Sequence, residues 1–290
     1  MNALQRFLRN PQFLRFAYSP RLLSALTTLG LADRLRAYHY RSVVRADGNY
    51  RTSLLGRQAS FRVENPRDLS RVEFILSTET EIVEAIMRSL GAGDVFLDIG
   101  ANVGVFAIFS AQIVGEAGQV LAFEPEIQRF TRLQENLTLN GLGNVRPFRI
   151  ALGEQEGEGR LCVKGMPSPS LVAPKGHGEV SAEYEPVEVV RGDDFWKVHC
   201  LPSPRVVKID VEGYELSVLR GLREVLSGPA TTLLVCEIHP WAGITVEDVR
   251  ELVASMRFTV VSTSTRQGEI HLFARKEPLL ADATRQQITV

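Results

Sequence analysis

From about residue 80 onward, apolar runs of strand length alternate with segments in which apolar positions recur at helical spacing. Val95–Asp98 and Gln119–Glu124 predict buried strands, and helices are predicted over 103–114 and 127–139. Strands that alternate with helices in this way build a parallel sheet covered on both faces. The hydrophobic pattern therefore predicts an α/β fold.

The later part of the chain continues this alternation and then ends differently. Further strands are predicted at 145–150, 206–210 and 232–238, and further helices at 214–226 and 245–256. The last two strands, 258–263 and 269–274, flank Arg266-Gln267-Gly268, which is typical of a hairpin turn. We therefore expect a seven-stranded mixed sheet with a C-terminal antiparallel hairpin, whereas a dinucleotide-binding dehydrogenase sheet stays parallel to its last strand.

The chain divides into a short basic part, a long α/β part and a tail. We expect a basic helical N-terminal segment at 1–70, the main domain at 71–280 and a tail at 281–290. An irregular loop insertion is expected at about 160–190, because residues 165–178 (GMPSPSLVAPKGHG) are too rich in Gly and Pro for a core element. We predict that this loop forms a lid on the substrate side.

Charge is distributed unevenly between these parts. Residues 1–50 carry eight arginines against Asp33 and Asp47, a net charge of +6, while the remainder holds 25 basic and 32 acidic side chains, a net charge of -7. Apolar positions at helical spacing in 4–16 and 22–29 predict two amphipathic helices. Basic helices of this kind lie flat on anionic membrane surfaces, but they also occur as helical caps packed on a domain. Both interpretations stay open.

The composition is that of an ordinary globular protein, with 44% hydrophobic and 23% charged residues. A net charge of -1 gives no general attraction to nucleic acid. Cys162, Cys200 and Cys236 are odd in number and form no CxxC pair, which argues against a disulfide framework and a zinc site. No apolar run approaches the roughly 18 residues of a membrane span. We expect a cytoplasmic protein, either free or attached to a membrane through the basic segment.

The strongest chemical signal is the sequence Asp98-Ile-Gly100-Ala-Asn102-Val-Gly104, which lies where a predicted strand ends and a helix begins. Gly100 and Gly104 allow a tight turn and a close approach of a ligand to the backbone and the helix N-terminus. A dinucleotide fingerprint requires glycine at the positions of Asn102 and Val105. The loop therefore indicates a nucleotide-like ligand and argues against a diphosphate.

Two carboxylates at strand ends narrow the choice of ligand. Glu124 follows Gly104 by 20 residues and is placed to accept hydrogen bonds from both hydroxyls of a ribose. Asp98 ends the preceding strand, where a carboxylate suits a cationic amino group. An adenosine joined to an amino acid, without phosphates, fits these features, and S-adenosylmethionine is such a molecule. The alternative is a solvated strand end with a glycine turn.

Several ordered motifs carry a more specific resemblance: FLDIGANVG, AFEPE, LQENLTLNG, VVKIDVEGYELSVLRG and LLVCEIHP. Over about residues 79 to 240 the chain resembles the FkbM family of S-adenosylmethionine-dependent methyltransferases. The resemblance implies the class I, Rossmann-like methyltransferase fold. It also implies methylation of hydroxyl groups on sugars, glycans or glycolipids, polyketides and similar natural products.

The resemblance also implies roles for individual residues. Asp98, Gly100, Asn102 and Gly104 match the first motif of the family and are expected to hold the methionine part and to surround the sulfonium. Glu124 matches the acid that binds the ribose. Ala151 and Asn140 are expected near the adenine. Glu79 is similar to the glutamate that precedes the first motif, but its flanking residues depart from the family pattern.

A second group of ionisable residues follows the predicted strands at 206–210 and 232–238. It consists of Lys208, Asp210, Glu212, Glu237 and His239. The carboxyl ends of parallel strands meet at one sheet edge, which is where ligands of open α/β sheets bind. Transfer of a methyl group to a hydroxyl benefits from a positioned base that removes the proton during attack.

We expect Asp210 or His239 to be this base, Glu212 and Glu237 to orient the acceptor, and Lys208 to hold a neighbouring carboxylate. One alternative is a divalent metal bound by Asp210, Glu237 and His239, although their spacing matches no dedicated metal motif. A second alternative is a purely structural role, in which Glu212 caps the following helix and Lys208 only forms an ion pair.

Two other function classes stay open. A catalytically silent cofactor-binding or scaffold protein would keep the Asp98 and Glu124 site without needing the second cluster. An NAD-dependent oxidoreductase is disfavoured by the glycine pattern and the closing hairpin. The expected partner is a small-molecule or glycan acceptor rather than nucleic acid. The sequence identifies neither the acceptor nor the oligomeric state.

Overall fold

The computed structural model describes residues 31–164, 168–171, 183–266 and 268–276. The two amphipathic helices predicted at 4–16 and 22–29, the tail at 281–290 and most of the predicted lid lie outside these residues. Within the described part, no helix combines the length and the apolar character needed to cross a bilayer.

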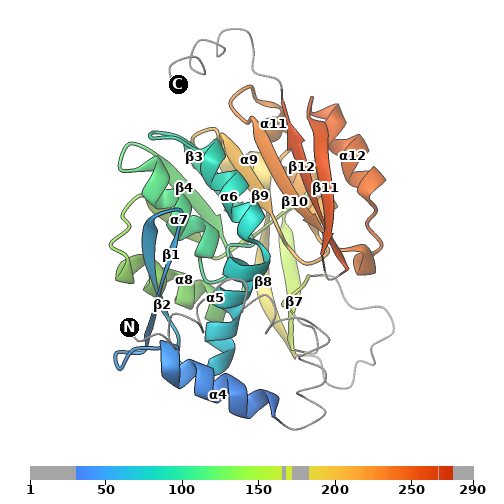
Figure 1. The fold of residues 1–290 in the computed structure, drawn as a ribbon. Coiled ribbons are helices and arrows are strands. Elements are labelled where there is room, and N and C mark those ends of the chain that lie inside the picture. Colours follow the sequence, from blue (N-terminus) through green and yellow to red (C-terminus); the bar gives the residue numbers. More distant parts are fainter. Residues whose placement is uncertain (1–30, 165–167, 172–182, 267, 277–290) are drawn as a thin grey trace.

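A seven-stranded sheet forms the centre of the molecule (Figure 1). Its strands, in spatial order, are β11 (Thr259–Arg266), β12 (Glu269–Arg275), β10 (Leu233–Ile238), β9 (Val206–Ile209), β3 (Val95–Ile99), β4 (Gln119–Phe123) and β5 (Val145–Phe148). Neighbours from β10 to β5 are parallel, whereas β12 is antiparallel to both β10 and β11. The sheet confirms the predicted class I methyltransferase fold with its C-terminal hairpin.

Helices cover both faces of this sheet, as the pattern predicts. One face carries α5 (Pro66–Thr78), α6 (Thr80–Ser89), α7 (Val105–Val114) and α8 (Ile127–Leu139). The other carries α9 (Gly192–Val198), α10 (Glu215–Gly221), α11 (Arg223–Ser227) and α12 (Val246–Ser255). Successive strand residues alternate between the two cores: Phe96 packs in the first and Leu97 in the second, as the period of two in a strand requires.

The described part of the N-terminal segment is not wholly helical. Helix α4 (Ala32–Val43) is followed by an antiparallel hairpin of β1 (Asn49–Leu54) and β2 (Arg57–Arg62). The hairpin forms because Ala59 and Phe61 alternate with polar residues and Leu55 and Gly56 adopt the positive φ of a tight turn. The boundary predicted between residues 70 and 71 falls inside α5, so this segment is continuous with the main domain.

The region predicted as a loop insertion contains strands on both sides of its undescribed part. Strands β6 (Ala151–Gly153), β7 (Gly157–Lys164) and β8 (Glu183–Arg191) form a separate three-stranded sheet. The helix predicted over 214–226 is divided into α10 and α11 at Leu222. A short 3₁₀ helix, η2 (Pro240–Ala242), follows β10.

Candidate active site

The loop between β3 and α7 has the tight path that its glycines indicate. Gly100 has φ 80° and Gly104 has φ 91°, and Asn102 between them adopts a left-handed φ of 52°. A Cβ atom on Gly100 would lie 1.8 Å from the backbone oxygen of Asp210. Only glycine therefore allows the end of β3 to approach the end of β9 this closely. Gly104 directly precedes α7 and directs the helix N-terminus toward the loop.

A pocket opens beside this loop, between the ends of β3, β4 and β9. Its walls include Gly100, Asn102, Glu124, Ala151 and Asp210. Glu124 is buried and accepts hydrogen bonds from the backbone N–H groups of Asn102, at 2.9 Å, and Glu126, at 3.0 Å. Burial raises the pKa of Glu124, and the charge of Arg129 opposes this shift. Each carboxylate oxygen keeps a second lone pair for a ligand hydroxyl.

The residues of this pocket fit S-adenosylmethionine. Ala151 lies between Ile150 and Leu152, and all three line the pocket and offer an apolar contact for an adenine. The side-chain oxygen of Asn102 is buried without a hydrogen-bond partner in the described residues, so it has acceptor capacity for a ligand. Polar acceptors and an apolar wall thus converge on one pocket, as binding sites for small molecules require.

Three of the predicted cofactor contacts, Asp98, Gly104 and Asn140, are not among the residues that line the pocket. Asp98 is fully buried below the loop, is not among the residues lining the pocket and pairs with Lys208. Asn140 is also absent from the pocket wall. Its side chain donates to the backbone oxygen of Ser60, at 2.7 Å, and accepts from the Ser60 N–H, at 2.9 Å. These contacts attach β2 to the end of α8, so the structure gives Asn140 a structural role, and its contact with the adenine stays a prediction.

The ammonium group of Lys208 links the cofactor loop to the second cluster. It lies 3.1 Å from Asp210 and 3.6 Å from Asp98, and it donates to the Gly100 carbonyl at 3.0 Å. Burial works against the charge of Lys208, but the nearby carboxylates outweigh burial and raise its pKa. Burial would likewise raise the pKa of Asp210, yet Lys208 and then His239 lower it. Asp210 is therefore ionised at neutral pH.

His239 is held between two carboxylates below the surface of the site. Its Nδ1 lies 2.8 Å from Glu215, which is fully buried, and its Nε2 lies 3.3 Å from Glu212. Burial lowers the pKa of His239, but the hydrogen bond to Glu215 outweighs it and raises the pKa to about 9. At neutral pH this side chain is therefore a positively charged imidazolium, with a proton on both ring nitrogens, and it is a poor proton acceptor. Glu212 has φ 54° and lies in the turn before α10 rather than capping that helix.

The ends of β10 and β12 bring further ionisable groups to the same edge. Glu237 is paired with His271 in the antiparallel register, and the His271 Nε2 lies 3.2 Å from a Glu237 oxygen. Burial raises the pKa of Glu237 well above its usual range, and it lowers that of His271 to about 4. Burial, followed by the charge of Asp210, raises the pKa of Glu79 to about 8. Glu79 is therefore largely protonated at neutral pH.

A second cavity adjoins the cofactor pocket. It shares four wall residues with that pocket, namely Asn102, Arg129, Asp210 and Glu212. Its other walls include acidic Glu79, Glu237 and Glu269 at the sheet edge and arginines from α4 and α5. Carboxyl groups at one side can accept hydrogen bonds from a polyhydroxylated molecule. Asp210 and Glu212 thus lie where the two cavities meet.

The sequence patterns missed several members of this site. Glu269 and His271 come from the terminal strand, and only the register of β12 against β10 places His271 beside Glu237. Glu215 lies in a recognised motif, but its contact with His239 depends on the turn before α10. The cavity-lining arginines Arg67 and Arg71 lie four residues apart on α5, a spacing that could have indicated a shared helix face.

Two groups of side chains have the geometry to bind a metal ion. In Asp210, Glu212 and His239, one ligand atom from each residue lies within 4.8 Å of the other two. Glu237, His239 and Glu269 form the second such group. The predicted metal set of Asp210, Glu237 and His239 is therefore divided between two groupings that share the histidine.

The chain is similar in sequence to known methyltransferases. The family model described as "Methyltransferase FkbM domain" matches residues 98–260. "Hexuronic acid methyltransferase AglP" from Haloferax volcanii is 30% identical over 223 residues, which cover 77% of this chain and 87% of that protein. "Methyltransferase 1" from Beauveria bassiana is 27% identical over 143 residues, 43% of this chain and 57% of the relative. A solved FkbM methyltransferase structure from Methylobacillus flagellatus superimposes with a TM-score of 0.45 at 18% identity, covering 72% of this chain and 54% of that one.

Proposed function

The chain belongs to the FkbM family of S-adenosylmethionine-dependent methyltransferases, and from this premise we propose that it methylates an oxygen atom of a sugar-containing acceptor. The relative named as a hexuronic acid methyltransferase supports a sugar as the acceptor. The acid-lined cavity beside the cofactor pocket supports an acceptor with several hydroxyl groups. Neither a silent scaffold nor an oxidoreductase receives comparable support.

Cofactor binding is proposed to use the walls of the first pocket. Glu124 would bind the ribose hydroxyls, Ala151 would contact the adenine, and Gly100 and Asn102 would approach the methionine part. The role of Asp98 would be indirect, because it is buried and pairs with the Lys208 ammonium below the loop. Bound S-adenosylmethionine supplies an electrophilic methyl group on a sulfonium.

The acceptor hydroxyl is proposed to donate a hydrogen bond to Asp210. As the acceptor oxygen forms its bond to the methyl carbon, the bond from that carbon to sulfur breaks and the hydroxyl proton passes to Asp210. Lys208 keeps Asp210 ionised at neutral pH, because its ammonium lies 3.1 Å from the carboxylate. Holding acceptor and donor in line, away from water, would supply most of the acceleration.

His239 is proposed to act as a positioning residue rather than as the base. With its proton in place it holds Glu212, whose carboxylate lines both cavities. Glu212 and Glu237 would then accept hydrogen bonds from other hydroxyls of the acceptor. This arrangement leaves Asp210 as the ionised carboxylate between the two cavities.

The observation that carries the proposal is the position of Asp210 on the wall that the two cavities share. We would measure S-adenosylhomocysteine binding by isothermal titration and methyl transfer from labelled S-adenosylmethionine to a panel of sugars. Asp210→Asn should keep cofactor affinity and lose roughly 10²- to 10⁴-fold in turnover, the usual contribution of a general base. Asp194→Asn, at an exposed carboxylate of α9 that lines neither cavity, is the matched control. Full turnover in Asp210→Asn would reject Asp210 as the base.

A metal-assisted reaction is the second candidate, supported by the mutual proximity of Asp210, Glu212 and His239. Glu215 contacts Nδ1 of His239, as a carboxylate that orients a metal-binding imidazole would, and leaves Nε2 for the ion. The raised pKa of His239 opposes this candidate, because a proton must leave before a metal binds. Titration of the protein with Mg²⁺ and Mn²⁺, and assay after chelator treatment, test it. Full activity of the chelated enzyme would exclude a required metal.

A peripheral membrane contact is a separate proposal, supported by the eight arginines of residues 1–50 and the apolar positions among them. Sedimentation with vesicles that contain anionic lipids tests it. Binding that is the same with neutral vesicles, or absent with both, would reject it.

A further inference from the structure

Four arginines line the acceptor cavity together with the carboxyl groups of the sheet edge. Arg67 and Arg71 are four residues apart on α5, Arg129 lies in the first turn of α8, and Arg36 comes from α4. Residues four apart share a helix face, and the Ser70 and Phe74 side chains of the same face line this cavity too. The lining of the cavity thus combines a group of arginines with a group of carboxyl side chains.

Among the described residues, Arg67, Arg71 and Arg129 of the cavity have no close ion pair with a carboxylate. Arg129 is only 9% exposed, and its one side-chain hydrogen bond among the described residues is to the Ser168 hydroxyl at 3.4 Å. In the same part of the chain no carboxylate lies within ion-pair distance of Arg129 or Arg67, and Arg71 has only Asp68 at 3.7 Å. Partial burial, and then the like charge of Arg129, lower the pKa of Arg71. These cations therefore repel one another across the cavity.

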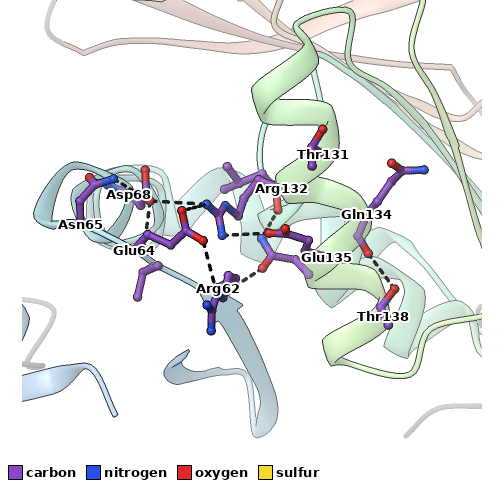
Figure 2. A network of polar contacts seen from close by, with 12 residues as sticks. Arg62, Glu64, Asn65, Asp68, Thr131, Arg132, Gln134, Glu135 and Thr138 are labelled. Carbon is purple, nitrogen blue, oxygen red and sulfur yellow. Dashed lines mark hydrogen bonds and ion pairs between the residues drawn. The ribbon is translucent and has the colours of Figure 1, made fainter. Parts of the chain in front are cut away.

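The acidic residues beside the start of α5 form ion pairs with Arg132, which does not line the cavity (Figure 2). Arg132 of α8 lies 3.0 Å from Glu64, 3.8 Å from Asp68 and 2.9 Å from Glu135. Its contacts tie the start of α5 to α8, and Asn65 caps α5 at the same place. The network holds α5 and α8 together, with Arg67, Arg71 and Arg129 on the cavity side.

We propose that Arg67, Arg71 and Arg129 bind an anionic group of the acceptor, a carboxylate or a phosphate carried on a sugar. This inference rests on the proposed function and specifies the acceptor class for the same site. Guanidinium groups match carboxylate and phosphate oxygens with paired hydrogen bonds, and an anion here relieves the repulsion among the arginines. With the anion at these arginines, the hydroxyl groups of the acceptor face carboxyl groups of the same cavity, among them Asp210 and Glu212. Groups of opposite charge within one cavity thus fix one orientation of the acceptor.

Binding of matched aryl glycosides to the full chain tests the proposal. The probes are 4-nitrophenyl glucuronide, the corresponding glucoside and the glucoside 6-phosphate, which share three ring hydroxyls and differ at the sixth carbon. Each is titrated into the protein saturated with S-adenosylhomocysteine. Charge-assisted hydrogen bonds predict that the wild type binds one or both anionic probes about tenfold or more tightly than the glucoside. Comparison of the affinities for the glucuronide and for the glucoside 6-phosphate identifies whether a carboxylate or a phosphate is recognised.

Substitution of the two α5 arginines provides the second arm. Arg67→Gln combined with Arg71→Gln should lose this preference and leave S-adenosylhomocysteine affinity unchanged, because neither residue lines the cofactor pocket. Arg88→Gln, at a largely exposed arginine on α6, is the matched control and should keep the preference. Equal binding of all three probes by the wild type, or an unchanged preference in the double variant, would overturn the proposal. Loss of S-adenosylhomocysteine binding by the wild type would instead contradict the proposed function.

Discussion

At the scale of single residues, Lys208 is the cation on which the ionisation of the site depends. Its ammonium pairs with Asp98 and Asp210, and both of its ion pairs are largely buried. Lys208→Met should destabilise the fold by about 3–5 kcal/mol, because it leaves buried carboxylates without a partner. It should also raise the pKa of Asp210, so the acidic limb of the activity profile should move to higher pH.

Urea unfolding and turnover measured as a function of pH check this prediction, with Lys208→Arg as the variant that keeps the charge. An acidic limb at the same pH in Lys208→Met would contradict the role given to Lys208. Loss of stability alone would not distinguish this role from packing, so the pH profile is the decisive measurement.

Gly100 tests whether close backbone approach builds the cofactor pocket. Gly100→Ala places a Cβ atom 1.8 Å from the Asp210 oxygen, so the ends of β3 and β9 must separate. Gly93→Ala is a matched control, since Gly93 has a similar φ of 84° and no atom within 4 Å of the added Cβ. The control should cost only the left-handed strain of about 1–2 kcal/mol. Gly100→Ala should cost more and also lose S-adenosylhomocysteine affinity by titration. Equal effects of the two substitutions would refute this reasoning.

How far a site residue can be predicted depends on whether its neighbours are local in the chain. Gly100 and Asn102 could be assigned to the cofactor pocket because one short loop sets their geometry. His271 could not be assigned, because its contact with Glu237 depends on strand register between segments 34 residues apart. The contact of Asn140 with Ser60 could not be predicted, because Ser60 lies 80 residues away in a hairpin that the sequence did not predict.

At the scale of elements, the attachment of β2 to α8 explains what Asn140 does. Its side chain makes two hydrogen bonds to Ser60 and one to the Asn136 carbonyl. Asn140→Ala should lower the free energy of unfolding by about 1–3 kcal/mol, at roughly 1 kcal/mol for each bond lost. Cofactor affinity should not change, because Asn140 lies outside the pocket wall.

Thermal unfolding and titration with S-adenosylhomocysteine, run on the same samples, check this prediction. Thr138→Ala, two residues earlier at an exposed position, serves as the control. A large loss of cofactor affinity in Asn140→Ala at unchanged stability would support the adenine role that the sequence predicted.

The elements themselves were predictable where periodicity was strong. The buried strands β3, β4, β9 and β10 are short apolar runs, and their order along the chain follows the alternation with helices. The hairpin of β1 and β2 was missed because it was included in the N-terminal segment, whose basic residues and helical spacing lie mainly before residue 50. Its alternating buried residues, such as Ala59 and Phe61, carry the signal.

At the scale of the whole molecule, the ionisable cluster couples folding to pH. His239 has its pKa raised from 6.5 to about 9, so its stabilising contribution is complete below pH 6.5 and is lost as the pH rises through about 9. Glu79 has its pKa raised from 4.5 to about 8, so its stabilising contribution is complete below pH 4.5 and is lost as the pH rises through about 8. His271 acts in the opposite sense, because its pKa is lowered to about 4 and its contribution is lost only below pH 6.5.

Between pH 6.5 and 8, His239 and Glu79 lower the stability in the same direction as the pH rises, and His271 contributes no slope. The free energy of unfolding, measured in urea, should therefore fall with rising pH by at most about 1.4 kcal/mol per pH unit for each group. His239→Gln should reduce this slope between pH 6.5 and 9, whatever its effect on stability at a single pH. Glu79→Gln should reduce the slope mainly below pH 8. If a variant shows the same change in the free energy of unfolding per pH unit as the wild type, the substituted group binds its proton equally well in the folded and unfolded chain.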